Sequence, residues 1–193
     1  MRSTFFIFLV IAFVSCSRKD EGTSTLFNVD SLISAQVQIL SAQKAKLNKT
    51  SSLDGEMSTI SIIPSGTPAW KKELEIFNML SVINKPINKS QYRIEVQADQ
   101  TSNLKIKAFT NKSNLSVSYL KIYYQDSMAK IRKIKAEYIE SNTLYKSKRI
   151  LEMEFQPLND KMTLTSYRVE GTQAMFIGDS VHYKIDTTVI IFK

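Results

Sequence analysis

From Gln91 onward, this 193-residue chain consists mostly of short runs in which apolar and polar side chains alternate. Alternation with a period of two is typical of β-strands that bury one face. The runs are joined by short turn-forming segments, which predicts an antiparallel meander. A phase change near Leu120 predicts a bulge in the third run. The expected strands cover residues 91–97, 104–108, 115–124, 130–140, 144–155, 162–175 and 181–192.

A helix is expected before the strands, because apolar residues there follow the 3–4 spacing of a helical face. Asn28 or Asp30 can accept backbone N–H groups at its first turn. Lys44 and Lys46 would then lie near its carboxyl end, where the helix dipole favours cations. The expected stripe contains Val29, Leu32, Ile33, Gln36, Val37, Leu40, Lys44 and Leu47.

A hairpin and a second helix follow. Asp54-Gly55 separates the expected strands 48–53 and 56–63, and both residues tolerate the positive φ angles of a tight turn. Thr67-Pro68 predicts the start of the second helix, with Thr67 as its cap. Pro86 predicts its end, because the residue before a proline disfavours helical geometry.

These elements together predict an α+β fold. We expect two N-terminal helices packed on one curved antiparallel meander sheet of about seven to nine strands. Each helix has an apolar stripe that needs an apolar surface, and the strands offer one. Trp70 and Phe77 on the second helix are the expected anchors of the core.

The first residues predict export. Arg2 is followed by an apolar run from Phe5 to Val14, then by Ser15 and by Cys16, the only cysteine of the chain. This order is typical of a secretory signal that is cleaved before a cysteine. The run is too short for a transmembrane anchor, which needs roughly 20 residues. An ordinary signal peptide with a nearby cysteine is the other alternative. We expect a signal peptide (1–15), a lipidated tether (16–27) and a single α+β domain (28–193).

Phe13-Val14-Ser15-Cys16 resembles the relaxed lipoprotein signal of Bacteroidota, and the segment 17–21 (Ser-Arg-Lys-Asp-Glu) resembles their surface-export signal. The body also resembles a set of small Bacteroidota lipoproteins, through Trp70, Leu74, Phe77 and the stretch Ile83-Asn84-Lys85-Pro86. The resemblance implies acyl chains on Cys16, a place on the outer membrane and, through the export signal, display on the cell surface. It implies no activity. A more distant likeness to the lipoprotein carriers of the outer membrane suggests a sheet that shelters an apolar ligand.

The chain is basic, with 26 Lys and Arg against 18 Asp and Glu, and a formal net charge of +8. Such a balance favours nucleic acid, anionic lipid or acidic glycans as partners. Export argues against nucleic acid. The alternative is that the lysines keep exposed strand faces soluble and protect sheet edges.

Residue patterns for catalysis are missing from the sequence. His182 is the only histidine, which excludes a metal site with two histidine ligands. The chain has no Gly-x-Ser-x-Gly turn and no phosphate-binding glycine loop. Its carboxylates Glu137, Glu140, Glu152 and Glu154 stand among lysines on strands expected to face water. We therefore expect no enzymatic activity, metal or cofactor.

One basic cluster is the candidate binding site. Adjacent strands could merge its members into a patch for an anionic glycan, a phospholipid headgroup or an envelope protein. The alternative is general solubility. Its members are Lys130, Arg132, Lys133 and Lys135 on one expected strand and Lys146, Lys148 and Arg149 on the next.

These features lead to one expected function and one alternative. The first is a non-enzymatic lipid-anchored protein of the outer membrane that binds or supports another envelope component. The alternative is a carrier that shelters a lipid or other apolar ligand between the sheet and the helices.

Overall fold

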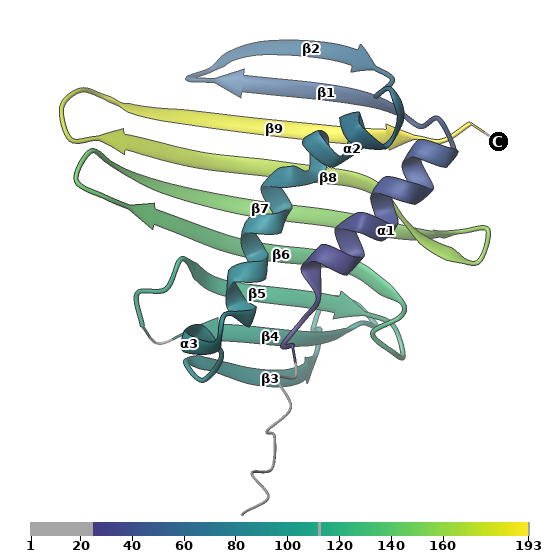
Figure 1. The fold of residues 1–193 in the computed structure, drawn as a ribbon, viewed down its shortest axis with the longest axis horizontal. Coiled ribbons are helices and arrows are strands. Elements are labelled where there is room, and N and C mark those ends of the chain that lie inside the picture. Colours follow the sequence, from purple (N-terminus) through teal and green to yellow (C-terminus); the bar gives the residue numbers. More distant parts are fainter. Residues whose placement is uncertain (1–24, 112, 193) are drawn as a thin grey trace, which may run out of the picture.

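The computed structural model describes residues 25–111 and 113–192. Within them the chain forms one nine-stranded antiparallel sheet, with helices on one of its faces (Figure 1). The predicted antiparallel sheet is confirmed, and the helices on one face fit the predicted α+β class. The strands are β1 (Lys46–Leu53), β2 (Glu56–Ile62), β3 (Tyr92–Ala98), β4 (Lys105–Asn111), β5 (Val117–Tyr124), β6 (Ile131–Ser141), β7 (Tyr145–Leu158), β8 (Lys161–Met175) and β9 (Ser180–Ile190).

The strand order is β2-β1-β9-β8-β7-β6-β5-β4-β3. Strands β3 to β9 are therefore a meander, in which each strand pairs with the next along the chain. The β1–β2 hairpin joins this meander at its far side, where β1 pairs with β9 and Lys46 lies opposite Ile190. The sheet is open, and β2 and β3 form its two edges.

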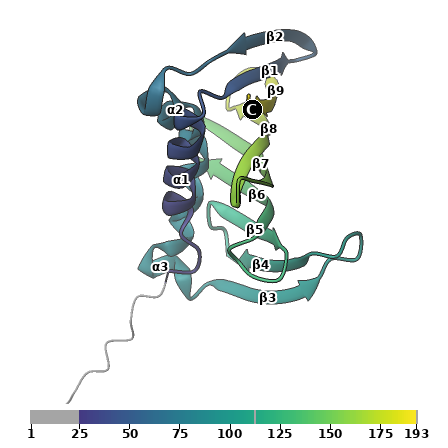
Figure 2. The same cartoon turned by 90° about the vertical axis from the view of Figure 1, so that its right-hand side faces the viewer.

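The helical layer contains α1 (Val29–Ala42), α2 (Gly66–Leu74), the 3₁₀ helix η1 (Glu75–Asn84) and the short α3 (Pro86–Lys89). Figure 2 shows this layer on one side of the sheet. Helix α1 packs against α2, η1 and β8, while η1 contacts β5 and β6. No helix among the described residues is long and apolar enough to cross a membrane.

Helix α1 begins as predicted and ends earlier. The Asn28 side chain accepts a hydrogen bond from the Ser31 backbone N–H at 2.9 Å, which caps the first turn. The helix ends at Ala42, because Lys44 takes a positive φ of 46° and turns the chain into β1. The expected extension to Leu47 was wrong, since Leu47 is buried from β1 instead. The predicted stripe is buried at Val29, Ile33, Gln36, Val37 and Leu40.

The second helical segment begins before the predicted residue, and it ends where Pro86 predicts, since Lys85 is extended. Ser65, not Thr67, is its N-cap residue, and no side chain caps the backbone there. After Leu74 the α-helix tightens into η1, which ends at Asn84. Pro86 then starts α3, at a position where the backbone N–H that proline lacks would have no partner within the helix.

The core lies between the helices and the sheet. Trp70 and Phe77 have no exposed surface, as expected of core anchors. The Phe77 ring meets the Tyr167 ring edge-on, with centroids 5.7 Å apart and planes at 83°. Other fully buried side chains fill the same space. They are Leu40, Leu47, Leu74, Leu80, Ile83, Phe109, Leu120, Ile122, Ile134 and Leu151.

A buried polar side chain ties α1 to the sheet. The Gln36 amide donates to the Met162 carbonyl at 2.9 Å and accepts from the Leu164 backbone N–H at 2.8 Å. Both backbone groups belong to the first part of β8, before Ser166, where the pairing with β9 begins. Gln36 is therefore a satisfied core residue, which explains a polar residue within an apolar stripe.

Two strand details depart from simple alternation. The predicted bulge falls between Val117 and Tyr119, next to Leu120. In β4 the core residue is Phe109, which pairs with Leu120. Ile106 and Ala108 are also buried, but they pair with Tyr123 and Lys121 on the face of the sheet away from the helices.

Candidate functional site

The predicted basic cluster is divided between two faces of the sheet. We call the face opposite the helices the outer face. Lys133 and Lys135 of β6 lie there, as do Lys146 and Lys148 of β7, because the residues between them face the core or helix side. Arg149 lies on the helix side, one residue along from Lys148.

The cations of the outer face are matched by carboxylates on neighbouring strands. Lys133 lies between two glutamates of β7, with its Nζ 3.1 Å from Glu152 and 3.3 Å from Glu154. Lys135 approaches Glu152 at 2.6 Å, and Lys148 approaches Glu137 at 2.6 Å. The charges of three predicted cluster residues are therefore paired with carboxylates of the sheet itself.

The pairs extend across β8 and β9. The Arg168 guanidinium donates to the Asp186 carboxylate, and Lys184 lies 2.9 Å from the same carboxylate. The outer face of β6 to β9 thus alternates in sign from strand to strand. Cross-strand pairs of opposite charge stabilise a sheet modestly, and they leave little net charge to attract a distant anion.

The pKa shifts agree with this pairing. Burial opposes the ionisation of Glu152, but hydrogen bonds from Lys135 and Lys133 outweigh it and hold its pKa below the usual value. The pKa of Glu137 is lowered in the same way, with burial opposed by Lys148 and Ser118. Both carboxylates are therefore ionised at neutral pH.

Arg149 is built into the fold on the helix side. Its Nε donates to the Tyr183 hydroxyl at 3.1 Å, and one terminal nitrogen reaches Met79 Sδ in η1 at 3.5 Å. The Glu140 carboxylate is 3.7 Å away and also accepts from the Tyr145 hydroxyl at 2.7 Å. These contacts join β6, β7, β9 and η1, which is a structural role.

Of the two remaining cluster members, Lys130 lies in the turn between β5 and β6, and Arg132 lies at the start of β6. Lys130 pairs with Asp126 at 2.8 Å, and both side chains are exposed. Arg132 donates to the Gln125 side-chain oxygen at 2.8 Å. The structure therefore does not bring all seven predicted residues into one patch.

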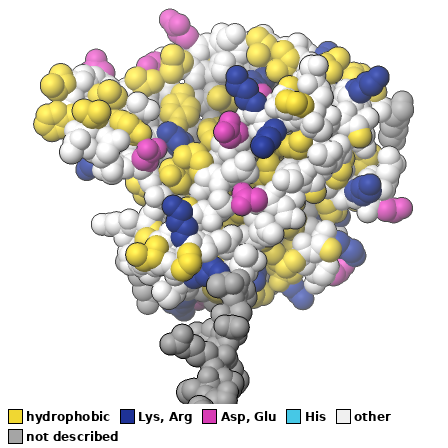
Figure 3. Space-filling model, viewed as in Figure 1, with side chains coloured by type: hydrophobic (Ala, Val, Ile, Leu, Met, Phe, Trp, Pro, Cys, Tyr) yellow, Lys and Arg dark blue, Asp and Glu magenta, His cyan; other side chains and the backbone are white. Residues whose placement is uncertain are grey.

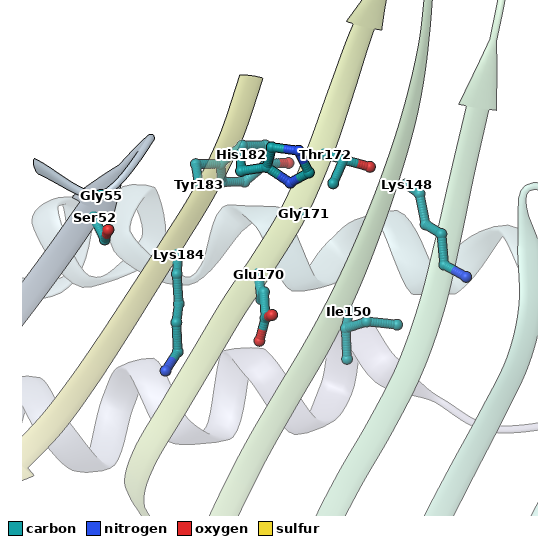
Figure 4. A pocket seen from close by; sticks show the side chains of 10 residues that line it. All are labelled: Ser52, Gly55, Lys148, Ile150, Glu170, Gly171, Thr172, His182, Tyr183 and Lys184. Atoms are coloured by element: carbon teal, nitrogen blue, oxygen red, sulfur yellow. The ribbon is translucent and has the colours of Figure 1, made fainter. Parts of the chain in front are cut away.

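A shallow hollow opens on the outer face beside the β1–β2 turn (Figure 4). Its volume is about 240 Å³, and strands β1, β7, β8 and β9 line it. His182 lies opposite Thr172 on the neighbouring strand. Among the described residues, no side-chain hydrogen bond joins the imidazole to a hydroxyl or a carboxylate. The lining residues are Ser52, Gly55, Lys148, Ile150, Glu170, Gly171, Thr172, His182, Tyr183 and Lys184.

A larger trough, of about 600 Å³, lies at the same end of the strands. It is formed by the loop before β5, the end of β6, the start of β7 and the end of β8. Lys146 and Lys148 line it together with several serines, so this trough is where the predicted cluster meets a hollow. Sequence reasoning missed the serines because their hydroxyls signal turns as readily as sites. They are Ser113, Ser116, Ser118, Ser141 and Ser147.

The third notable hollow is apolar and lies on the helix side. It has a volume of about 400 Å³ and opens between β2 and α2. At its wall Lys49 pairs with Glu73 at 2.5 Å, and Glu73 also accepts from the Tyr167 hydroxyl. Burial and the Glu73 carboxylate raise the pKa of Tyr167. The apolar lining comes from Ile62, Pro64, Ala69, Ile76, Val169 and Ile185.

Residues 25–111 and 113–192 contain no group of three or more His, Asp or Glu side chains placed to hold a metal ion. Cys16, the predicted lipidation site, lies outside the described residues. Comparison of the chain with protein-family models, with curated protein sequences and with solved structures found no match in any of the three.

Proposed function

We propose that this chain is a non-enzymatic cell-envelope protein, anchored in the outer membrane by acyl chains on Cys16 and displayed on the cell surface. In this proposal the helices sit on the concave side of a curved sheet, and the domain binds or supports another envelope component. The lipoprotein-like segment Phe13-Val14-Ser15-Cys16 supports the anchor. Candidate partners are envelope proteins, anionic glycans and lipids; nucleic acid is not among them.

The core between the helices and the sheet is filled with side chains, and this observation supports an accessory function over a carrier function. Trp70, Phe77 and Leu120 are among the side chains there that have no exposed surface. Two of the hollows described above open on the outer face, and the apolar one opens to solvent on the helix side, between β2 and α2. A domain with this arrangement binds through its surface, and the serine-lined trough that contains Lys146 and Lys148 is the proposed surface for a polar ligand.

Metabolic labelling with palmitate tests the anchor. The wild-type chain should take up label and fractionate with membranes. Cys16→Ser should lose both properties, while Ser17→Ala, which alters the neighbouring residue and keeps the thiol, should retain them. An unlabelled wild-type product, or a Cys16→Ser product that stays in the membrane fraction, would overturn the anchor.

One observation favours the carrier as a second candidate. The apolar hollow between β2 and α2, about 400 Å³, is within the size range of small-molecule sites. Native mass spectrometry of gently purified protein separates the two proposals. A carrier should show the mass of a bound lipid that is lost in Ala69→Trp, which fills the hollow. Lys71→Trp is the control, because Lys71 is exposed on the same helix and does not line the hollow.

A further inference from the structure

The described chain enters the domain at a defined point. The Asn84 side chain accepts from the Leu26 backbone N–H at 2.8 Å and donates to the Phe27 carbonyl at 2.7 Å. Asn84 ends η1, and α3 begins two residues later. Leu26 and Phe27, which the sequence assigned to the tether, are therefore held against the domain beside α3.

The reach of the tether is limited by chain length. Nine residues separate Cys16 from Leu26. At a maximum of about 3.3–3.6 Å per residue, the acylated cysteine stays within about 35 Å of the point where Asn84 holds the chain. Figures 1 and 2 both show α3 and β3 at the end of the molecule where the described chain begins.

That end of the molecule exposes apolar side chains, one of which lies between two lysines. We call residues 85–98 the α3–β3 edge. Ile87 is 75% exposed, and Val96, on the edge strand of the sheet, is 60% exposed. Lys85 and Lys89 flank Ile87 in sequence. Among the ion pairs of the described residues, Arg93 of this edge pairs with Glu95, whereas neither Lys85 nor Lys89 has an acidic partner.

We infer that the α3–β3 edge rests on the surface of the membrane that holds acylated Cys16. Ile87 and Val96 enter the interface, and Lys85 and Lys89 lie against anionic headgroups. Apolar side chains flanked by lysines bind such interfaces through both burial and charge. The inference rests on the proposed anchor. Acylated Cys16 would hold the α3–β3 edge close to the membrane, so that the edge meets the membrane surface repeatedly.

A second exposed apolar group provides the contrast. Phe176 and Ile177, at the turn between β8 and β9, are 82% and 86% exposed. Hydrophobic side chains gather over this turn in Figure 3. The segment 171–179 has no Lys or Arg and includes Asp179, so it lacks the charge that attracts an anionic surface. It also lies far from β3, because β8 and β9 are five and six places from β3 in the strand order.

Vesicle binding tests the edge without the anchor. The buried core lies between Val29 and Val189, so a chain that begins at Ser17 keeps all of it. This chain should sediment with phosphatidylglycerol-containing vesicles and bind less in high salt. Lys85→Gln with Lys89→Gln should weaken binding about 10- to 30-fold, and Ile87→Asn with Val96→Asn about tenfold. Phe176→Asn with Ile177→Asn should bind as the parent does.

The inference is overturned if the parent chain binds no vesicle, or if the Phe176 and Ile177 pair weakens binding as much as the edge variants do. Because this chain lacks Cys16, its result does not depend on acylation. A failure of palmitate labelling would thus overturn the proposed anchor on Cys16, whereas the vesicle measurement would still test whether the α3–β3 edge binds lipid.

A polarity-sensitive fluorophore tests the edge in the full lipidated chain. With Cys16 acylated, a cysteine introduced by Ile87→Cys is the only free thiol. Its fluorophore should shift to the blue when the protein is reconstituted in vesicles. The same fluorophore on Ile177→Cys should keep its aqueous emission. Equal emission at the two positions would contradict the inference.

Discussion

The two faces of the sheet differ although the same strands build both. On β7, Leu151 has no exposed surface beneath the helical layer, while the next residue, Glu152, points outward between Lys133 and Lys135. The helix side is stabilised by apolar volume. The outer face is covered by ion pairs between neighbouring strands. Stability should therefore depend on the helix side, and the outer face should tolerate change.

The largest expected effect is on the helix side. Trp70→Ala should lower the free energy of unfolding by about 3–5 kcal/mol, because it leaves a large cavity under α2. Chemical denaturation would measure it. Trp70→Phe is the control and should cost much less, since the buried Trp70 Nε1 has no hydrogen-bond partner among the described residues. Equal losses in the two variants would contradict a role based on volume.

Gly171, on the helix side of β8, tests how closely the Tyr183 side chain packs on the sheet. A Cβ at this position would lie 2.6 Å from the Lys148 backbone oxygen and 2.6 Å from the Tyr183 hydroxyl. Gly171→Ala should therefore cost about 1–3 kcal/mol of unfolding free energy. Thr172→Ala, one residue further on the outer face, should change it by less than about 0.5 kcal/mol. Thermal unfolding of both variants measures this difference in stability. A neutral Gly171→Ala would contradict the prediction.

The two hydrogen bonds of the Gln36 amide test a polar contact on the helix side of the sheet. Gln36→Met keeps the shape but leaves the Met162 carbonyl and the Leu164 N–H without their partner, which should cost about 1–3 kcal/mol. Gln38→Met, on the exposed side of α1, is the matched control and should be nearly neutral. Amide hydrogen exchange at Leu164 should speed up in the first variant only.

The smallest effect is expected on the outer face. Glu152→Gln should cost about 0–1 kcal/mol at neutral pH, and Glu154→Gln, whose side chain is 53% exposed, still less. The pKa of Glu152 is lowered in the folded state. Its contribution is therefore complete above the unfolded pKa, about 4.3, and is lost as the pH falls through the folded value. Unfolding curves of wild type and Glu152→Gln should converge once the pH falls below the lowered folded pKa of Glu152, and a gap that widens in acid would contradict this.

The overall fold could be predicted because it follows from local periodicity. The seven strands of the meander and the Asp54-Gly55 hairpin each carry their own signal. The end of α1 could not be predicted, because a positive φ at Lys44 is a response to the chain that must turn into β1. The change from α2 to η1 is likewise set by packing on β5 and β6.

The candidate site depends on register, which local patterns do not give. Sequence reasoning placed Lys133 and Lys148 on adjacent strands and Glu152 on the same outer face. The pairing of Lys133 with Glu154, and of Lys135 with Glu152, follows only from the observed register of β6 and β7. A cluster that is basic in sequence is therefore almost neutral across the sheet.

The position of β9 has a consequence for how the molecule is made. Lys46 and Ile190 are partners although almost the whole domain separates them along the chain. The β1–β2 hairpin is synthesised early, but β1 cannot pair with β9 until β9 has left the ribosome. Such distant pairing slows folding, because the sheet cannot be completed around β1 before β9 has been made.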